Sequence, residues 1–174
     1  MKRLSSQLIL CSPEHILRNT VIELTDDGIV TRLIDLQHQQ AETAHTLFFD
    51  GVISSGIVSL KSVLSNNQID ELRSSYNYID LSIDNDIVFS NKPMIIDFGT
   101  NNDHRLINKI LTEKHVLLQP INLYEFITGC TYTPTLILKT NHQLRVSGQP
   151  ELILWQNLNL VNKHILPDTR IKLL

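Results

Sequence analysis

The sequence is poor in the residues that disulfide scaffolds, phosphate loops and membrane spans require. Its two cysteines, Cys11 and Cys130, are far apart in the chain, which favours reduced thiols over a disulfide framework. Its six glycines occur singly, so no glycine-rich loop is present to cradle a phosphate. The apolar run Leu8–Cys11 is too short for a signal peptide, and no run approaches the ~20 apolar residues of a membrane-spanning helix. We therefore expect a cytoplasmic protein without a membrane partner.

Charged residues are also few and nearly balanced. The 15 Lys and Arg residues and the 18 Asp and Glu residues give a net charge of −3, so the basic surface that nucleic-acid binding requires is missing. Tyr76 and Tyr78 are not interleaved with basic residues, which gives base stacking no support. Hydrophobic residues make up 42% of the chain and charged residues 19%, as in a globular protein with an ordinary core. We expect no nucleic-acid partner.

Motifs for catalysis are missing as well. No two of the seven histidines are two, three or four positions apart, the spacings that bring two imidazoles to one metal from one element. No Gly-x-Ser-x-Gly motif occurs, and Cys130 falls on the apolar face of an expected helix, where a core role is the simpler interpretation. The best remaining polar cluster comprises Asp97, Asp103 and His104. A helix N-cap beside a surface histidine explains the last two more simply.

The first part of the chain is patterned as β-strands. Thr20–Leu24 and Ile29–Leu36 flank Asp26-Asp27-Gly28, a strong hairpin signal because glycine accepts the positive φ that such turns need. Two further strands are expected at Gln7–Cys11 and Leu47–Ile53.

The rest of the chain mixes helices with short strands. Asn122, with Glu125 three residues later, predicts the start of a helix whose apolar face includes Cys130. Leu106–Leu111 carries an apolar stripe at helical spacing, after a turn that offers an N-cap. The other expected elements are a helix at Asn66–Ser75 and strands at Tyr78–Ile83, Ile87–Phe89, Met94–Phe98, Leu136–Lys139, Glu151–Gln156 and Arg170–Leu174.

Three segments resemble parts of amidohydrolase-superfamily enzymes, in the order in which those enzymes carry them. Phe48–Val58, continued by Ser59–Leu64, resembles the segment where a first strand delivers a His-x-His metal pair. Ile95–Asn101 resembles the last barrel strand, and Gly148–Trp155 resembles the strand that closes a small β-rich domain beside the barrel. The resemblance implies a composite β-rich domain built from both ends of the chain, next to a (β/α)8 barrel.

The sequence departs from that family at the positions that would bind metal. Lys61 and Val63 occupy the two histidine positions, and Asn101 stands where the family has an aspartate after Gly-Thr. A protonated lysine has no lone pair to donate and valine has no donor atom, so we expect neither a metal nor another cofactor. A closed barrel also needs ~250 residues, far more than residues 59–140 supply.

The expected fold is therefore α+β. Residues 1–58 and 141–174 should form one composite, β-rich and sandwich-like domain that makes the two ends of the chain neighbours. Residues 59–140 should form a small α/β insert, the remnant of a (β/α)8 barrel. Loss of the barrel would uncover Met94–Phe98 and the stripe of Leu106–Leu111, so we expect a homodimer or another protein partner.

The resemblance and the departures from it together predict a non-catalytic, amidohydrolase-like protein with a structural, regulatory or binding role. Two alternatives remain open. One is a hydrolase that acts on C–N bonds of a cyclic amide or amidine, with a metal site rebuilt around Asp97, Asp103 and His104. The other is a small-molecule-binding module that uses a remaining pocket near Gly99–Asp103 and Lys61.

Overall fold

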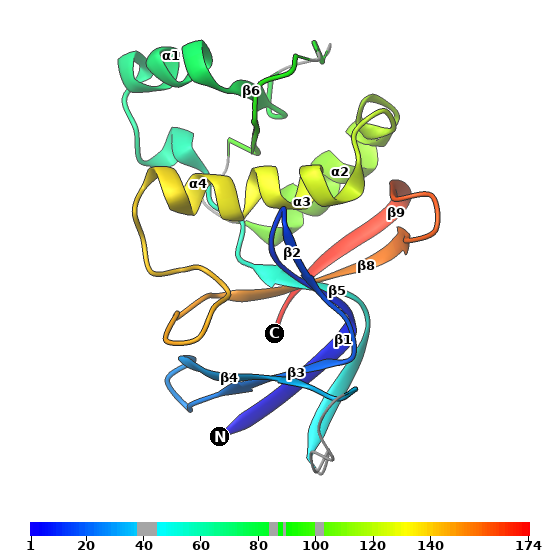
Figure 1. The fold of residues 1–174 in the computed structure, drawn as a ribbon. Helices are drawn as coiled ribbons and strands as arrows, with labels where there is room; N and C mark the ends of the chain where they lie inside the picture. The colour runs from blue at the N-terminus through cyan, green and yellow to red at the C-terminus, as the bar shows by residue number, and fades with distance from the viewer. Residues whose placement is uncertain (38–44, 84–86, 89, 100–102) are drawn as a thin grey trace.

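The computed structural model describes residues 1–37, 45–83, 87–88, 90–99 and 103–174. The strands of its large sheet are β1 (Lys2–Ser12), β2 (His15–Leu17), β3 (Thr20–Leu24), β4 (Val30–Asp35), β5 (Thr46–Ser55), β8 (Leu152–Asn159) and β9 (His164–Leu173). Their order is β4-β3-β1-β5-β8-β9, with β2 paired to β1 (Figure 1). Because β5 pairs with β8, strands from both ends of the chain share this sheet.

Two glycines shape the large sheet. Gly28 has a φ of 80° in the turn that joins β3 to β4, which confirms the predicted hairpin. Gly51 lies in β5 with a φ of 128°, and a Cβ there would be 2.0 Å from the carbonyl oxygen of Trp155. Only a glycine lets β8 approach β5 this closely. The neighbouring β1–β5 pairing is parallel, unlike the hairpin pairing of β3 with β4.

A two-stranded parallel sheet, one 3₁₀ helix and four α-helices make up the middle of the described chain. These elements are η1 (Leu60–Ser62), α1 (Asn66–Ser75), β6 (Asn77–Asp80), β7 (Met94–Asp97), α2 (His104–Leu118), α3 (Leu123–Cys130) and α4 (Tyr132–Ile137). The Asn122 side chain accepts a hydrogen bond from the Tyr124 N–H, so α3 begins where the sequence predicts. No helix in the described residues is both long and apolar enough to cross a membrane.

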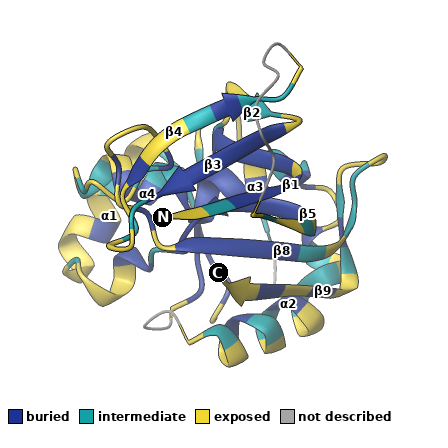
Figure 2. Ribbon diagram, turned by 90° about the horizontal axis from the view of Figure 1, so that it is seen from below, coloured by how far each residue is buried: buried dark blue, intermediate teal, exposed yellow. Residues whose placement is uncertain are grey.

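The main hydrophobic core lies between the large sheet and helices α2 and α3. Strands β1 and β3 are largely buried, whereas β4 and β9 are mostly exposed or intermediate (Figure 2). Leu8 and Trp155 from the sheet belong to the same buried cluster as Ile107 and Phe126 from the helices. The ring of Phe126 meets the rings of Phe98 and Trp155 edge-on, with centroids 6.4 Å and 5.9 Å apart. The two parts of the chain that the sequence separates therefore share one core.

The coarse fold prediction is confirmed, since the chain is α+β with most of its strands in one sheet. The ends of the chain are neighbours, because Lys2, Leu173 and Leu174 line the same hollow (Figure 1). The expectation that Met94–Phe98 and the stripe of Leu106–Leu111 would be uncovered is wrong for most of their residues. Ile96 of β7 and Leu111 of α2 are fully buried within this chain, whereas Leu106 is 47% exposed.

Some predicted strands are also wrong. Leu136–Lys139 is not a strand, because the chain continues from α3 into the short helix α4. Pro134 lies in the first turn of α4, where its missing N–H costs no helical hydrogen bond. The strand predicted at Tyr78–Ile83 ends at Asp80 as β6. Of the strand predicted at Ile87–Phe89, residues 87 and 88 are not in a strand, and Phe89 lies outside the described residues.

Candidate functional site

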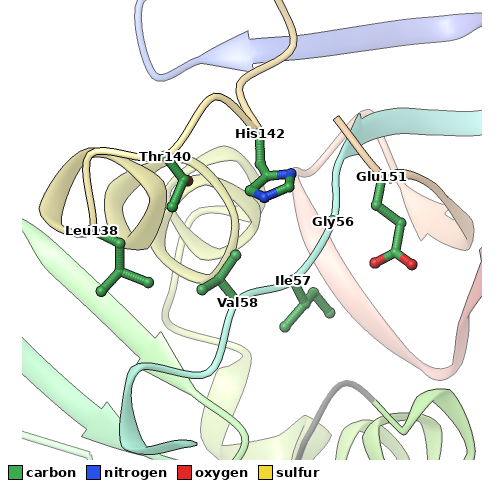
Figure 3. A pocket seen from close by; sticks show the side chains of 7 residues that line it. All are labelled: Gly56, Ile57, Val58, Leu138, Thr140, His142 and Glu151. Carbon is green, nitrogen blue, oxygen red and sulfur yellow. The ribbon is translucent and has the colours of Figure 1, made fainter. Parts of the chain in front are cut away.

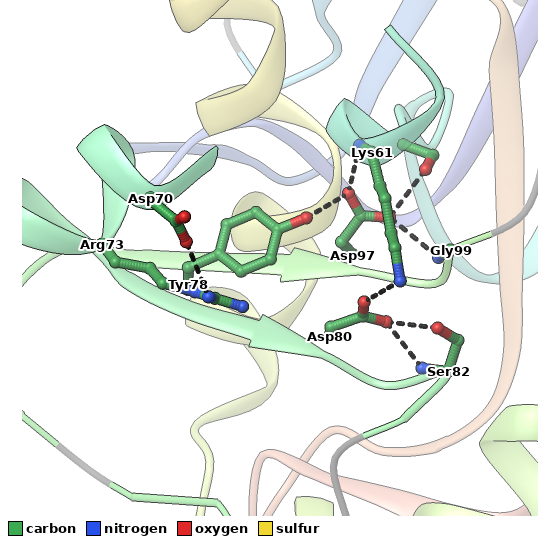
Figure 4. A network of polar contacts seen from close by, with 9 residues as sticks. Lys61, Asp70, Arg73, Tyr78, Asp80, Ser82, Asp97 and Gly99 are labelled. Carbon is green, nitrogen blue, oxygen red and sulfur yellow. Dashed lines mark hydrogen bonds and ion pairs between the residues drawn. The ribbon is translucent and has the colours of Figure 1, made fainter. Parts of the chain in front are cut away.

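Two buried aspartates end the two strands of the small parallel sheet. Asp80 closes β6 and Asp97 closes β7, and the two residues are paired across the sheet. Asp80 is 2% exposed and Asp97 is 1% exposed. In α/β proteins, ligands bind where the carboxyl ends of neighbouring parallel strands meet. The carboxyl ends of β6 and β7 are therefore the candidate functional site (Figure 4).

The carboxylate of Asp97 accepts four hydrogen bonds. The Ser59 hydroxyl and the Gly99 N–H donate to Oδ1 at 2.7 Å and 2.8 Å. The Lys61 N–H and the Tyr78 hydroxyl donate to Oδ2 at 2.8 Å and 2.7 Å. Hydrogen bonds to a charged carboxylate are stronger than those between neutral groups, so Asp97 ties together three segments that are distant in the sequence.

The local backbone structure positions these donors. Ser59 precedes η1, and this single helical turn directs the Lys61 N–H toward the end of β7. The Ser62 hydroxyl closes the turn by donating to the Ser59 carbonyl oxygen at 2.7 Å. Gly99 has a φ of 64°, and a Cβ there would lie 2.4 Å from Oγ of Ser82. A glycine is therefore required for this close approach.

Asp80 is held by the other end of Lys61. The ammonium of Lys61 lies 2.7 Å from Oδ2 of Asp80, and the side chains are 42% and 3% exposed. The Ser82 N–H donates to Oδ1 of Asp80 at 3.0 Å, and the Ser82 hydroxyl donates to the same oxygen. Lys61 thus contacts both aspartates, one through its backbone and one through its side chain (Figure 4).

The Tyr78 hydroxyl is a persistent hydrogen-bond donor. Burial raises the pKa of Tyr78 far above its usual range, and its hydrogen bond to Asp97 and the negative charges of Asp97 and Asp80 raise it further. Arg73, whose guanidinium lies 5.6 Å from the centre of the Tyr78 ring, acts in the opposite direction. Tyr78 therefore keeps its proton at neutral pH and cannot serve as a base.

A hollow of about 300 Å³ opens beside this network. Its walls come from η1, α1 and β6. The lining residues are Lys61, Asn66, Ile69, Asp70, Arg73, Tyr78, Asp80 and Ile83. Arg73 and Asp70 form an exposed ion pair of 2.9 Å at this hollow (Figure 4).

The other residues singled out from the sequence lie apart from this network or outside the description. Val63 follows η1 and is 63% exposed. Asp103 is the N-cap of α2, accepting from the Arg105 N–H at 2.9 Å, and His104 is the first residue of that helix. Asn101 lies outside the described residues.

The residues that the structure describes do not fit a hydrolytic metal centre. Within the described ranges, no three His, Cys, Asp or Glu side chains gather closely enough to hold a metal ion. Both oxygens of Asp97 already accept hydrogen bonds from the protein, and Asp80 is paired with the Lys61 ammonium. A metal could bind there only after these contacts were broken.

Sequence reasoning identified Lys61 and Asp97 but missed Asp80 and Tyr78. A signal was present, since an Ile-Asp pair ends both strands, at Ile79-Asp80 and at Ile96-Asp97. Placing the strand end at Ile83 put Asp80 inside the strand and hid this signal.

No model of a known protein family matches the chain. No curated protein and no solved structure matches it either. What the chain does must therefore be argued from its own site, because a fold alone does not determine function.

Proposed function

We propose that this chain is a non-catalytic, amidohydrolase-like module of the cytoplasm, with a structural, regulatory or binding role. The observation that carries the proposal is the way Lys61 spans the two buried aspartates. Its backbone N–H binds Asp97 and its ammonium binds Asp80, so a cation of the protein stands beside the acidic groups that would attract a metal. In this proposal, the contacts at the carboxyl ends of β6 and β7 serve to stabilise the fold.

The chemistry of the site supports the same conclusion. Metal-assisted hydrolysis requires a water molecule of lowered pKa and a side chain that can move its proton. Asp97 accepts four hydrogen bonds from the protein, and Tyr78 retains its proton because burial raises its pKa. Neither group is free to act as a general base.

We also propose that the small parallel sheet is what remains of a barrel. Barrel enzymes place their active-site residues at the carboxyl ends of parallel strands. Asp80 and Asp97 have that placement, and Lys61 comes to them from the position that the resemblance assigns to a metal-binding histidine.

Metal retention tests the proposal. Purified protein incubated with Zn²⁺, Fe²⁺ or Mn²⁺ and then desalted should retain far less than one metal per chain by mass spectrometry. It should not hydrolyse a cyclic amide or amidine such as dihydrouracil or cytosine. The variants Asp97→Asn, Asp80→Asn and the exposed control Asp168→Asn should give the same metal content. One retained metal per chain, lost in either buried-aspartate variant but kept in the control, would overturn the proposal.

The hollow at the same edge supports the second candidate function, a small-molecule-binding module. It presents a guanidinium, an ammonium and two carboxylates, so a planar polar molecule would find both donors and acceptors there. A ligand that binds only the folded state raises the melting temperature. Thermal-shift measurements with nucleobases and cyclic amides, repeated on Arg73→Ala, should show a shift in the parent protein and a smaller one in the variant. Identical shifts in both would place the ligand elsewhere.

A homodimer or a protein partner remains part of the proposal, although most residues of the two segments first expected to need cover are buried within the chain. Light scattering of the purified protein over a range of concentrations tests whether it forms a homodimer. A monomer mass at the highest concentration would rule it out.

A further inference from the structure

A second cavity, separate from the Lys61 site, lies where the chain leaves the large sheet. It has a volume of about 400 Å³, within the usual range for small-molecule sites. The chain that follows β5, the chain that follows α4 and the start of β8 surround it (Figure 3). Its lining residues are Gly56, Ile57, Val58, Leu138, Thr140, His142 and Glu151.

One side of this cavity is apolar and fixed in place. Ile57, Val58 and Leu138 contribute hydrocarbon surface to it. The Val58 N–H donates to the Cys130 carbonyl oxygen at 3.0 Å, which attaches this segment to the end of α3. An apolar group of a ligand would be removed from water there.

The polar side of the cavity offers hydrogen-bond acceptors. Nδ1 of His142 lies 3.2 Å from the Gln149 carbonyl oxygen, and because a carbonyl can only accept, this nitrogen carries the proton. In the tautomer that has its only ring proton on Nδ1, Nε2 is an acceptor. The carboxylate of Glu151 accepts as well, and the buried hydroxyl oxygen of Thr140 has no hydrogen-bond partner in the described chain.

Gly56 makes room for Glu151 at this cavity. A Cβ at position 56 would lie 3.0 Å from Oε2 of Glu151 and 3.2 Å from its Cβ. Contacts this short would force the glutamate to move. The absence of a side chain at Gly56 therefore allows the carboxylate to lie along the edge of the cavity, as Figure 3 shows.

Three acceptors, one of them negatively charged, complement a group that has several N–H donors, a positive charge and no acceptor. A primary ammonium has three donors and no lone pair. We propose that this cavity binds a small primary amine in its ammonium form. The ammonium contacts Glu151, His142 and Thr140, and the hydrocarbon body packs on Ile57 and Leu138. This inference does not depend on the function proposed for the Lys61 site.

Three probes of one shape test the charge requirement. They are cyclohexylmethylamine, cyclohexylmethanol and cyclohexanecarboxylate, titrated into the full chain by calorimetry at neutral pH. The amine should bind at least about tenfold more tightly than the alcohol, since hydrogen bonds to charged groups are the stronger ones, and the acid should not bind. Equal affinity for amine and alcohol, or no saturable binding of the amine, would overturn the proposal.

Substitutions of the lining residues test whether the amine binds in this cavity. Glu151→Gln keeps the shape but removes the charge, and should weaken amine binding about tenfold. Thr140→Val should weaken it severalfold, Leu138→Trp should abolish it by filling the cavity, and the exposed control Glu14→Gln should leave it unchanged. A melting temperature close to that of the parent identifies the variants that are folded. Unchanged amine affinity in folded Glu151→Gln protein would show that the amine binds somewhere else.

Discussion

Lys61 contacts one buried carboxylate through its backbone N–H and another through its ammonium. A substitution can therefore remove the ammonium and keep the N–H. Lys61→Met keeps a long side chain and keeps the N–H on Asp97 but removes the ammonium from Asp80. Because the Asp80 side chain is 3% exposed, its charge would lose a partner that water can replace only in part. We expect the free energy of unfolding to fall by about 1–3 kcal/mol, as measured by urea unfolding. The exposed control Lys2→Met should change it far less.

A double-mutant cycle separates the ion pair from other effects of the substitution. Asp80→Asn alone should also destabilise the protein, and the double variant should be less destabilised than the sum of the two. Strict additivity would mean that the contact between Lys61 and Asp80 contributes nothing, which would remove the physical basis of the proposed function.

Tyr78 gives the site a pH dependence at high pH. Burial and its hydrogen bond to Asp97 raise its pKa in the folded protein, while an unfolded tyrosine titrates at about pH 10. The stability that Tyr78 contributes is therefore complete below about pH 10 and is lost as pH rises toward the folded pKa. Urea unfolding of Tyr78→Phe should show a shallower loss of stability above this pH than the parent. Tyr132→Phe, which leaves the contact with Asp97 intact, should follow the parent.

At the residue scale, the sequence identified important positions more reliably than it identified their roles. Lys61 was identified because it stands where a metal ligand is expected, but its contact with Asp80 joins residues 19 positions apart in sequence. No local pattern encodes such a contact. Asp103 is different, because an N-cap depends only on the residues that follow it, and its simpler interpretation is confirmed.

At the scale of elements, Asn108 of α2 serves as a partner for the outer edge of β9. Its side-chain amide accepts from the Ile171 N–H at 2.8 Å and donates to the Ile171 carbonyl oxygen at 3.2 Å. An uncovered strand edge invites pairing with other chains. Asn108→Ala should lower the free energy of unfolding by about 1–2 kcal/mol and increase aggregation on heating. Lys109→Ala, one residue away and exposed, should do neither.

Elements defined by local chemistry were predicted well, and those decided by tertiary packing were not. The hairpin at Gly28 and the start of α3 at Asn122 follow from turn and cap residues. The helix α4 was missed because its threonines and aliphatic residues favour strands, and packing overrides such weak preferences. The candidate site shows both outcomes. Its two strands were predicted from the sequence, but the residues at which they end and their pairing with each other were not.

At the scale of the whole molecule, one core joins parts of the chain that the sequence divides into two domains. Phe126 of α3 is fully buried against Phe98, which follows β7, and Trp155, in the large sheet. Residues 59–140 therefore bury apolar surface against the residues on either side of them in sequence. A shared core of this kind predicts a single unfolding transition.

Two probes can follow that transition separately. Trp155 is the only tryptophan, so its fluorescence reports on the large sheet, whereas far-UV circular dichroism at the helical band reports mainly on helices within residues 59–140. Both signals should change at the same urea concentration. Phe126→Ala should lower the free energy of unfolding by about 3–5 kcal/mol and move both signals together, because the cavity would lie between the two parts. Leu106→Ala, at a 47% exposed position of α2, should move neither by much. Separate transitions for the two probes would mean that the parts unfold independently and that the core does not couple them.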